Sequence, residues 1–132
     1  MDMTPEFILL AFTLILALAQ ILAAGMASTA ELGGKWNAGP RDGDAQPSGK
    51  LAGRLKRAQN NLLETLPLFI GAVLMASIEG KFGFLTALGT HLYFFGRLIY
   101  VPLYAFGVPY VRSLVWLIAT GGLLMVIAAL FV

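Results

Sequence analysis

Long apolar stretches, each able to cross a membrane as a helix, constrain this chain more than any other feature. Residues 7–30 and 113–132 contain no charged residue. Glu64 is the only charge between residues 58 and 78, and residues 82–106 contain only His91 and Arg97 as ionisable groups apart from tyrosines. A spanning helix needs about 20 apolar residues. Since 58% of the residues are hydrophobic, 12% are charged and the mean hydropathy is +0.80, we expect an all-α integral membrane protein.

The spacing of these stretches predicts a bundle of four transmembrane helices. We expect helices at about 5–30, 51–78, 82–106 and 110–132, and a glycine- and proline-rich loop over 31–50. A chain of 132 residues is too short for several such units, so residues 1–132 are expected to form a single domain. A cleaved signal peptide is disfavoured, because the first stretch is too long and its front carries acidic rather than basic residues.

The distribution of basic residues predicts the orientation. Six of them lie in or near the first loop: Lys35, Arg41, Lys50, Arg54, Lys56 and Arg57. The connection between the second and third helices carries only Lys81. Because cytoplasmic loops are enriched in Lys and Arg, we expect the 31–50 loop on the cytoplasmic side and both termini on the opposite side. The polar start of the second helix, the end of the third and Arg112 then lie at the same membrane level.

Small residues in the first helix offer a surface for close packing. Ala19, Ala23 and Ala27 are spaced by four and would form a ridge along one face. An alanine-rich face that simply meets lipid is an equally good interpretation. Gln20 is polar at membrane depth and is therefore expected to face protein.

Two polar stripes mark the second and third helices. On the second helix the stripe runs along one face at spacings of three, four and three, through Arg54, Arg57, Asn61 and Glu64. On the third helix the spacings are four, three and four, through Tyr93, Arg97, Tyr100 and Tyr104. An arginine inside a membrane costs about 2.5–3.5 kcal/mol on the more lenient scale, so Arg97 needs a compensating group.

Two explanations of the stripes stay open. In the first, Glu64 and Arg97 form a buried pair that fixes helix packing, and the tyrosines sit at the membrane interface. In the second, the arginines hold an anionic ligand, because the two stripes and Arg112 together supply four arginines for one carboxylate within the membrane. We favour the anionic ligand. His91 is expected to be satisfied by packing, and no metal site is expected.

Composition limits the chemistry further. The chain has no cysteine, so a thiol that takes part in a reaction must come from a ligand. The net charge of +2 is small and the basic residues are clustered, which favours a topology signal or an anion site over nucleic-acid binding.

Two segments resemble a known family. The sequence R-A-Q-N-N-L-L-E-T-L-P-L-F at 57–69 is similar to the signature R-A-x-x-N-x-x-E-x-x-P of the membrane-associated proteins in eicosanoid and glutathione metabolism. Arg97, Tyr100 and Tyr104, followed by P-Y-V-R-S-L at 109–114, resemble the corresponding region of that family. The resemblance covers nearly the whole chain. Its G-P-R-D loop is similar to that of bacterial members, which implies a bacterial inner membrane.

The resemblance implies a homotrimer that binds glutathione between neighbouring subunits. Arg57, Asn61 and Glu64 would hold the glutathione backbone and its charged ends. Arg54 and Gln59 on the second helix and Arg97 on the third would support them. Tyr100 and Tyr104 would contact glutathione from the other subunit, and Arg112 would face the thiol.

The activity implied is that of a membrane glutathione transferase. Glutathione would be the co-substrate, and its partner a lipophilic electrophile from the bilayer, with reduction of lipid hydroperoxides as a further activity. The alternative is a non-catalytic lipid-binding or scaffold protein that resembles five-lipoxygenase-activating protein. That relative lacks the arginine at the thiol end, so Arg112 favours the enzyme. A transporter or channel is disfavoured, because the first and last helices carry almost no polar residue to line a pore.

Overall fold

Five helices make up the part of the chain that the structure, a computed structural model, describes, residues 2–40 and 49–132. They are α1 (Pro5–Leu32), α2 (Gly34–Ala38), α3 (Lys50–Ile78), α4 (Phe84–Ala105) and α5 (Tyr110–Ala129). All except α2 are long and apolar enough to cross a membrane. The predicted all-α architecture with four spanning helices is therefore confirmed. The short helix α2 was not expected, because its segment reads as loop; Arg41 and the remainder of 41–48 lie outside the described residues.

Local sequence signals explain where the helices begin and end. The Thr4 hydroxyl accepts a hydrogen bond from the Phe7 amide at 3.3 Å, and Pro5 occupies the first turn of α1, where its missing N–H costs nothing. The helix ends at Gly33, whose φ of 91° lies in a region that disfavours other residues. Gly107, with φ 73°, makes the turn between α4 and α5. These caps place the helix ends within a few residues of the predicted bounds.

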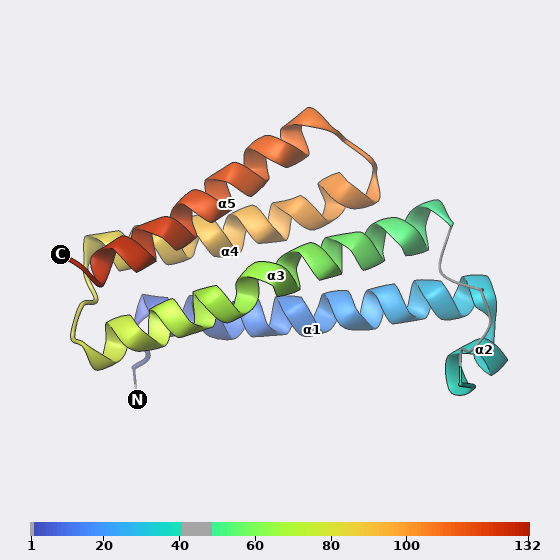
Figure 1. Ribbon diagram of the computed structural model, residues 1–132, viewed down its shortest axis with the longest axis horizontal. Coiled ribbons are helices and arrows are strands. Elements are labelled where there is room, and N and C mark those ends of the chain that lie inside the picture. The colour runs from blue at the N-terminus through green and yellow to red at the C-terminus, as the bar shows by residue number, and fades with distance from the viewer. Residues whose placement is uncertain (1, 41–48) are drawn as a thin grey trace.

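The helices form two antiparallel pairs that lie side by side. α1 packs mainly on α3, and α4 mainly on α5 (Figure 1). Both chain ends lie at one end of the bundle, and the α4–α5 turn and the start of α3 lie at the other (Figure 1). Arg54 Nη1 of α3 donates to the carbonyl of Ala105 in α4 at 3.3 Å. The start of α3 and the end of α4 therefore do lie at one level, as the sequence predicts.

A buried aromatic contact holds α3 against α4. The rings of Phe69 and Tyr93 stack with centroids 4.0 Å apart, and the Tyr93 hydroxyl lies 2.8 Å from Thr65 Oγ1. Both aromatic residues are at most 1% exposed. Because a well-packed core side chain has few alternative positions, this contact fixes how α4 is rotated relative to α3. It thereby sets the direction of Arg97 and Tyr100, the next residues along the stripe of α4.

Two expectations about α1 have different outcomes. Gln20 is 5% exposed, so the prediction that it faces protein is confirmed. Ala19 and Ala23 are exposed and Ala27 is half-buried, so the ridge is not used inside this bundle. It remains available to lipid or to a second copy.

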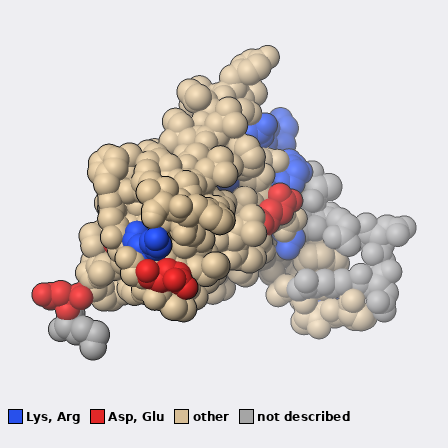
Figure 2. All heavy atoms as spheres, turned by 60° about the vertical axis from the view of Figure 1, so that its left-hand side comes forward, with Lys and Arg blue, Asp and Glu red and all other residues tan. Residues whose placement is uncertain are grey.

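The charged side chains leave most of the visible surface free. In Figure 2, most of the basic side chains in view gather in one region, another lies apart beside an acidic group, and broad areas contain neither acidic nor basic residues. Large apolar side chains are exposed along the spanning helices, including Ile15, Leu18, Leu117 and Leu124. Exposed apolar surface on four long helices suits lipid contact, and the chain is an integral multi-pass membrane protein.

Close glycine contacts join α4 to α5. A Cβ atom added to Gly122 would lie 2.5 Å from the carbonyl oxygen of Gly89, and one added to Gly96 would lie 2.8 Å from Ala119 Cβ. The two helices approach here and diverge toward the α4–α5 turn (Figure 1). Small residues at a helix crossing allow this approach.

We expect Gly122→Leu to destabilise the protein strongly, because the new side chain collides with backbone and α4 and α5 must separate. Overpacking of this kind costs about 1–3 kcal/mol. Gly121→Leu is the matched control, since an added Cβ there meets no other described atom within 4 Å. Thermal unfolding in detergent measures both variants. Equal stability of the two would show that the α4–α5 contact does not limit stability.

Candidate functional site

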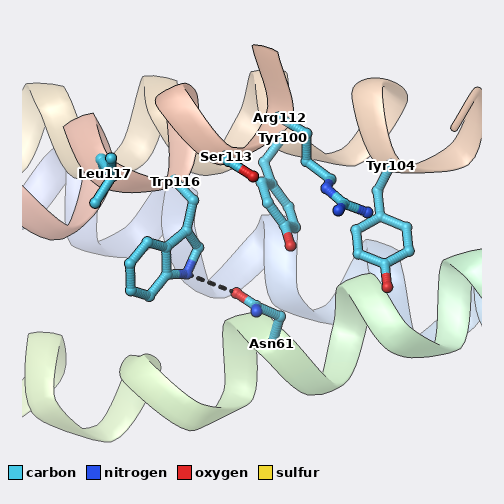
Figure 3. Close-up of a pocket in the computed structure, with 7 residues that line it drawn as sticks. All are labelled: Asn61, Tyr100, Tyr104, Arg112, Ser113, Trp116 and Leu117. Carbon is cyan, nitrogen blue, oxygen red and sulfur yellow. Dashed lines mark hydrogen bonds between the residues drawn. The ribbon is translucent and has the colours of Figure 1, made fainter. Parts of the chain in front are cut away.

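A polar pocket lies among α3, α4 and α5 at the basic end of the bundle. Its volume is about 430 Å³, and its lining residues are Asn61, Tyr100, Tyr104, Arg112, Ser113, Trp116 and Leu117 (Figure 3). Small-molecule sites commonly have volumes of about 300–1,000 Å³. Residues of three helices line the pocket, because α5 diverges from α4 toward the α4–α5 turn (Figure 1). The pocket lies at the end of the bundle where polar side chains occur.

Tyr104 links two arginines from different helices. Arg57 Nε of α3 donates to the Tyr104 hydroxyl at 3.2 Å. On the other side, the Arg112 guanidinium of α5 lies 4.6 Å from the centre of the Tyr104 ring, a cation–π distance. The two positive charges are therefore close to one aromatic ring, and this concentration of charge favours an anion beside it.

Asn61 accepts two hydrogen bonds, from donors on two different helices. Arg97 Nη1 donates to Asn61 Oδ1 at 2.8 Å. Trp116 Nε1 donates to the same oxygen at 3.0 Å, as the dashed line in Figure 3 shows. The Arg97 guanidinium also lies 4.4 Å from the centre of the Tyr100 ring. Arg97 is 2% exposed, and its Nε and Nη2 have no hydrogen-bond partner among the described residues.

The alternative of a buried Glu64–Arg97 pair is wrong. Glu64 is exposed, and within the described part of the chain it makes no salt bridge with Arg97. Asn61, three residues before Glu64 on α3, is the residue that lies level with Arg97. Thr65, which follows Glu64, is instead level with Tyr93. An amide oxygen and an aromatic ring meet the buried guanidinium instead.

His91 also differs from expectation. The sequence predicts a histidine satisfied by packing, whereas the structure exposes it on α4. Its Nδ1 lies 2.6 Å from the carbonyl oxygen of Ala87, one turn earlier, and its ring is near Phe95. The pattern of α4 explains this, because His91 lies on the face opposite Tyr93 and Arg97.

The remaining predicted site residues divide into three groups. Asn61, Tyr100, Tyr104 and Arg112 line the pocket, and Arg57 and Arg97 contact these lining residues. Arg54 instead binds the end of α4, where it also packs against Gly107. Gln59 is buried and Glu64 exposed, and neither lines the pocket.

Three lining residues were missed by the sequence analysis. Ser113 follows Arg112 directly, and Trp116 lies four residues after Arg112 on α5. Residues four apart share a helix face, so the spacing to Arg112 was a usable signal for Trp116. Leu117 gives the pocket an apolar wall at greater depth.

The chemical groups of the pocket favour an electron-rich ligand. Arg112 and Trp116 can only donate hydrogen bonds, and the hydroxyls of Tyr100, Tyr104 and Ser113 can also donate. Among the described residues that line the pocket there is no Asp or Glu. Carboxylate, thiolate or carbonyl groups are therefore the natural partners of this surface.

Fold and site together define a four-span helical membrane protein with a pocket at one end of the bundle that is lined by Arg112 and other hydrogen-bond donors. The model of the MAPEG family matches residues 8–132, nearly the whole chain, and the chain belongs to this family. Comparison with curated proteins and with solved structures finds no match.

Proposed function

We propose that the chain is a membrane glutathione transferase that conjugates glutathione to hydrophobic electrophiles. The observation that carries this proposal is the position of Arg112, which lines a donor-rich pocket beside Tyr104 and within reach of the same ring as Arg57. Membership of the family supports a glutathione-transferase-like or related membrane function. The arginines can bind the two carboxylates of glutathione, and the Glu64 carboxylate can bind its ammonium group.

Arg112 is assigned the activation of the thiol. A free thiol has a pKa of about 8.5, and lowering it to about 6 or 7 requires roughly 2–3 kcal/mol of preferential stabilisation of the thiolate. A guanidinium in a partly dry pocket is sufficient for this. The thiolate sulfur then forms a C–S bond to the electrophile, the bond to the leaving group breaks, and the thiol proton passes to water.

The same thiolate supports reduction of a lipid hydroperoxide. The sulfur attacks the terminal oxygen, the O–O bond breaks, and the lipid leaves as an alcohol after taking up a proton. A second glutathione converts the resulting sulfenic acid to the disulfide and water. The apolar bilayer beside the pocket supplies both classes of lipophilic substrate.

We propose further that the working unit is a homotrimer. Glu64 is exposed on a spanning helix, where a charge in contact with lipid is costly. Arg57, on the same helix, is also exposed. A neighbouring copy that covers this face of α3 would bring both residues to a ligand shared between subunits. The exposed ridge of Ala19 and Ala23 on α1 offers a surface for that approach.

The proposed location is a bacterial inner membrane with the pocket toward the cytoplasm. The end of the bundle that holds the pocket also carries Lys35, Lys50 and Lys56. Among the described residues, Lys81 is the only basic one at the other end. The excess of positive charge at one end supports this orientation. Glutathione, a soluble cytoplasmic thiol, would then reach the pocket directly.

A lipid-binding or scaffold role is the second candidate. It is favoured by a cavity of about 420 Å³ among α1, α3 and α4. Apart from Gln20 its lining residues are apolar: Leu16, Ala19, Ala23, Leu55, Leu98, Ile99, Val101 and Pro102. This cavity lacks the charged groups of the first pocket, so it suits a lipid chain rather than glutathione.

Conjugation by the purified protein tests the proposed function. With a model aryl halide and glutathione in mild detergent, we expect product formation that saturates with glutathione. Lipid hydroperoxide as the second substrate tests the reduction. If the protein binds glutathione but turns over neither several electrophiles nor the hydroperoxide, the enzymatic function is wrong and the scaffold role replaces it.

A further inference from the structure

The orientation of the Asn61 amide follows from its two partners. Arginine and the tryptophan indole carry hydrogen-bond donors and no acceptor. The amide atom that lies 2.8 Å from Arg97 Nη1 and 3.0 Å from Trp116 Nε1 must therefore be the oxygen, because an NH₂ group there would face two donors. The direction of this amide is thus fixed by chemistry.

This orientation determines what Asn61 offers to a ligand. A carbonyl oxygen has two acceptor sites, and both are in use on Asn61 Oδ1. Only the two hydrogens on Nδ2 remain. Since Asn61 lines the pocket, it presents donors there, as do its neighbours Arg112 and Tyr100.

We propose that Trp116 is a positioning residue which, together with Arg97, holds Asn61 as a hydrogen-bond donor to an acceptor oxygen of bound glutathione, a carboxylate or a peptide carbonyl. The proposal rests on the proposed function for the identity of the ligand. It adds the direction of the contact: the ammonium group of glutathione is excluded from Asn61, because an ammonium needs an acceptor.

Two features favour a positioning role over simple packing for Trp116. The indole has a single N–H, and it is directed at a side-chain amide on another helix, 55 residues away in the sequence. In addition, Trp116 lines the pocket next to Asn61 (Figure 3). Loss of the indole N–H would free one acceptor site on Asn61 Oδ1 and leave the amide held by Arg97 alone.

Asn61→Asp tests the direction of the contact. The aspartate keeps the shape of asparagine and satisfies Arg97 and Trp116 through one oxygen, but it presents acceptors to the pocket where Nδ2 stood. We expect glutathione affinity, measured by calorimetry in detergent, to fall about tenfold or more. Asn60→Asp is the matched control, since it adds the same charge at an adjacent, exposed position. Its affinity should stay within about threefold of the unsubstituted protein.

A spectroscopic experiment tests the positioning role without any ligand. Trp36 and Trp116 are the two tryptophans of the chain, so Trp36→Phe leaves Trp116 as the only indole. In this background we expect Asn61→Leu to shift the indole N–H resonance and to speed its exchange with solvent. Trp116→Phe should keep the aromatic packing and lower glutathione affinity several-fold. If Asn61→Asp does not fold, the glutathione affinity of Trp116→Phe serves as the test instead.

The outcomes separate the two proposals. An indole N–H resonance that does not move in Asn61→Leu overturns the positioning role, whatever the measured glutathione affinity. Glutathione binding by Asn61→Asp that equals or exceeds that of the unsubstituted protein overturns the donor assignment alone. Absence of glutathione binding by the unsubstituted protein overturns the proposed function and, with it, the ligand named here.

Discussion

Arg112→Ala is expected to slow conjugation about twentyfold near pH 7 while glutathione affinity changes only a few-fold. A thiol with a pKa of about 8.5 is about 3% ionised at pH 7, whereas one with a pKa near 6.5 is about three-quarters ionised. Removal of the guanidinium should therefore reduce the population of thiolate far more than it weakens binding. Because the free thiol ionises by itself at higher pH, the deficit should shrink to less than about twofold by pH 9. The ratio of kcat between variant and unsubstituted protein, followed across this pH range, measures the effect.

Variants at neighbouring positions serve as controls for Arg112. Arg112→Lys restores the charge without the planar fork, so partial rescue is expected. Tyr104→Phe and Ser113→Ala remove the hydroxyls that are rival donors to the sulfur in the same pocket. If Tyr104→Phe or Ser113→Ala abolishes thiolate formation and Arg112→Ala does not, the activating role belongs to the hydroxyl.

Arg57→Ala and Glu64→Gln are expected to weaken glutathione binding about tenfold or more, with little loss of stability. A charged hydrogen bond contributes about 1.5–3 kcal/mol, which corresponds to this change in affinity. Glu64 is exposed and has no salt bridge among the described residues, so its replacement breaks no ion pair of the bundle. Arg57 makes one contact with Tyr104, on an exposed side of α3. Calorimetry gives the affinity, and thermal unfolding without glutathione gives the stability.

Two exposed charges provide matched controls for this second experiment. Lys56→Ala removes a neighbouring positive charge, and Glu79→Gln removes a carboxylate at the other end of α3. Both should bind glutathione normally. Should Arg57→Ala and Glu64→Gln unfold at lower temperature yet bind glutathione as tightly as the unsubstituted protein, the two residues are structural.

The spanning helices were predictable because hydrophobicity over 20 residues is a strong and local signal. The stop at Gly33 and the turn at Gly107 follow from residues that disfavour continuation of a helix. The short helix α2 was not predictable in this way. It has five residues, glycines at both of its ends, and no apolar periodicity.

The sequence predicted which site residues lie at the same membrane level. It did not predict which way each side chain points around its helix axis. Asn61, Tyr100, Tyr104 and Arg112 meet because the predicted topology brings their helix ends to one level. Gln59 lies two residues from Arg57, about 200° around the helix, so it was bound to point elsewhere. Arg97 meets Asn61, while Glu64, almost one turn further along α3, is exposed. The register and rotation of α4 against α3 depend on packing, here the Phe69–Tyr93 stack, which the sequence pattern does not specify.

The ionisation of glutathione bound to the unsubstituted protein tests the central claim most directly. Thiolate absorbance, recorded as a difference spectrum while the pH is raised, gives the pKa of the bound thiol. The account predicts a pKa about one and a half to two and a half units below the usual value of about 8.5, and loss of most of this shift in Arg112→Ala. Glutathione that binds with the thiol titrating at its usual value would contradict the account.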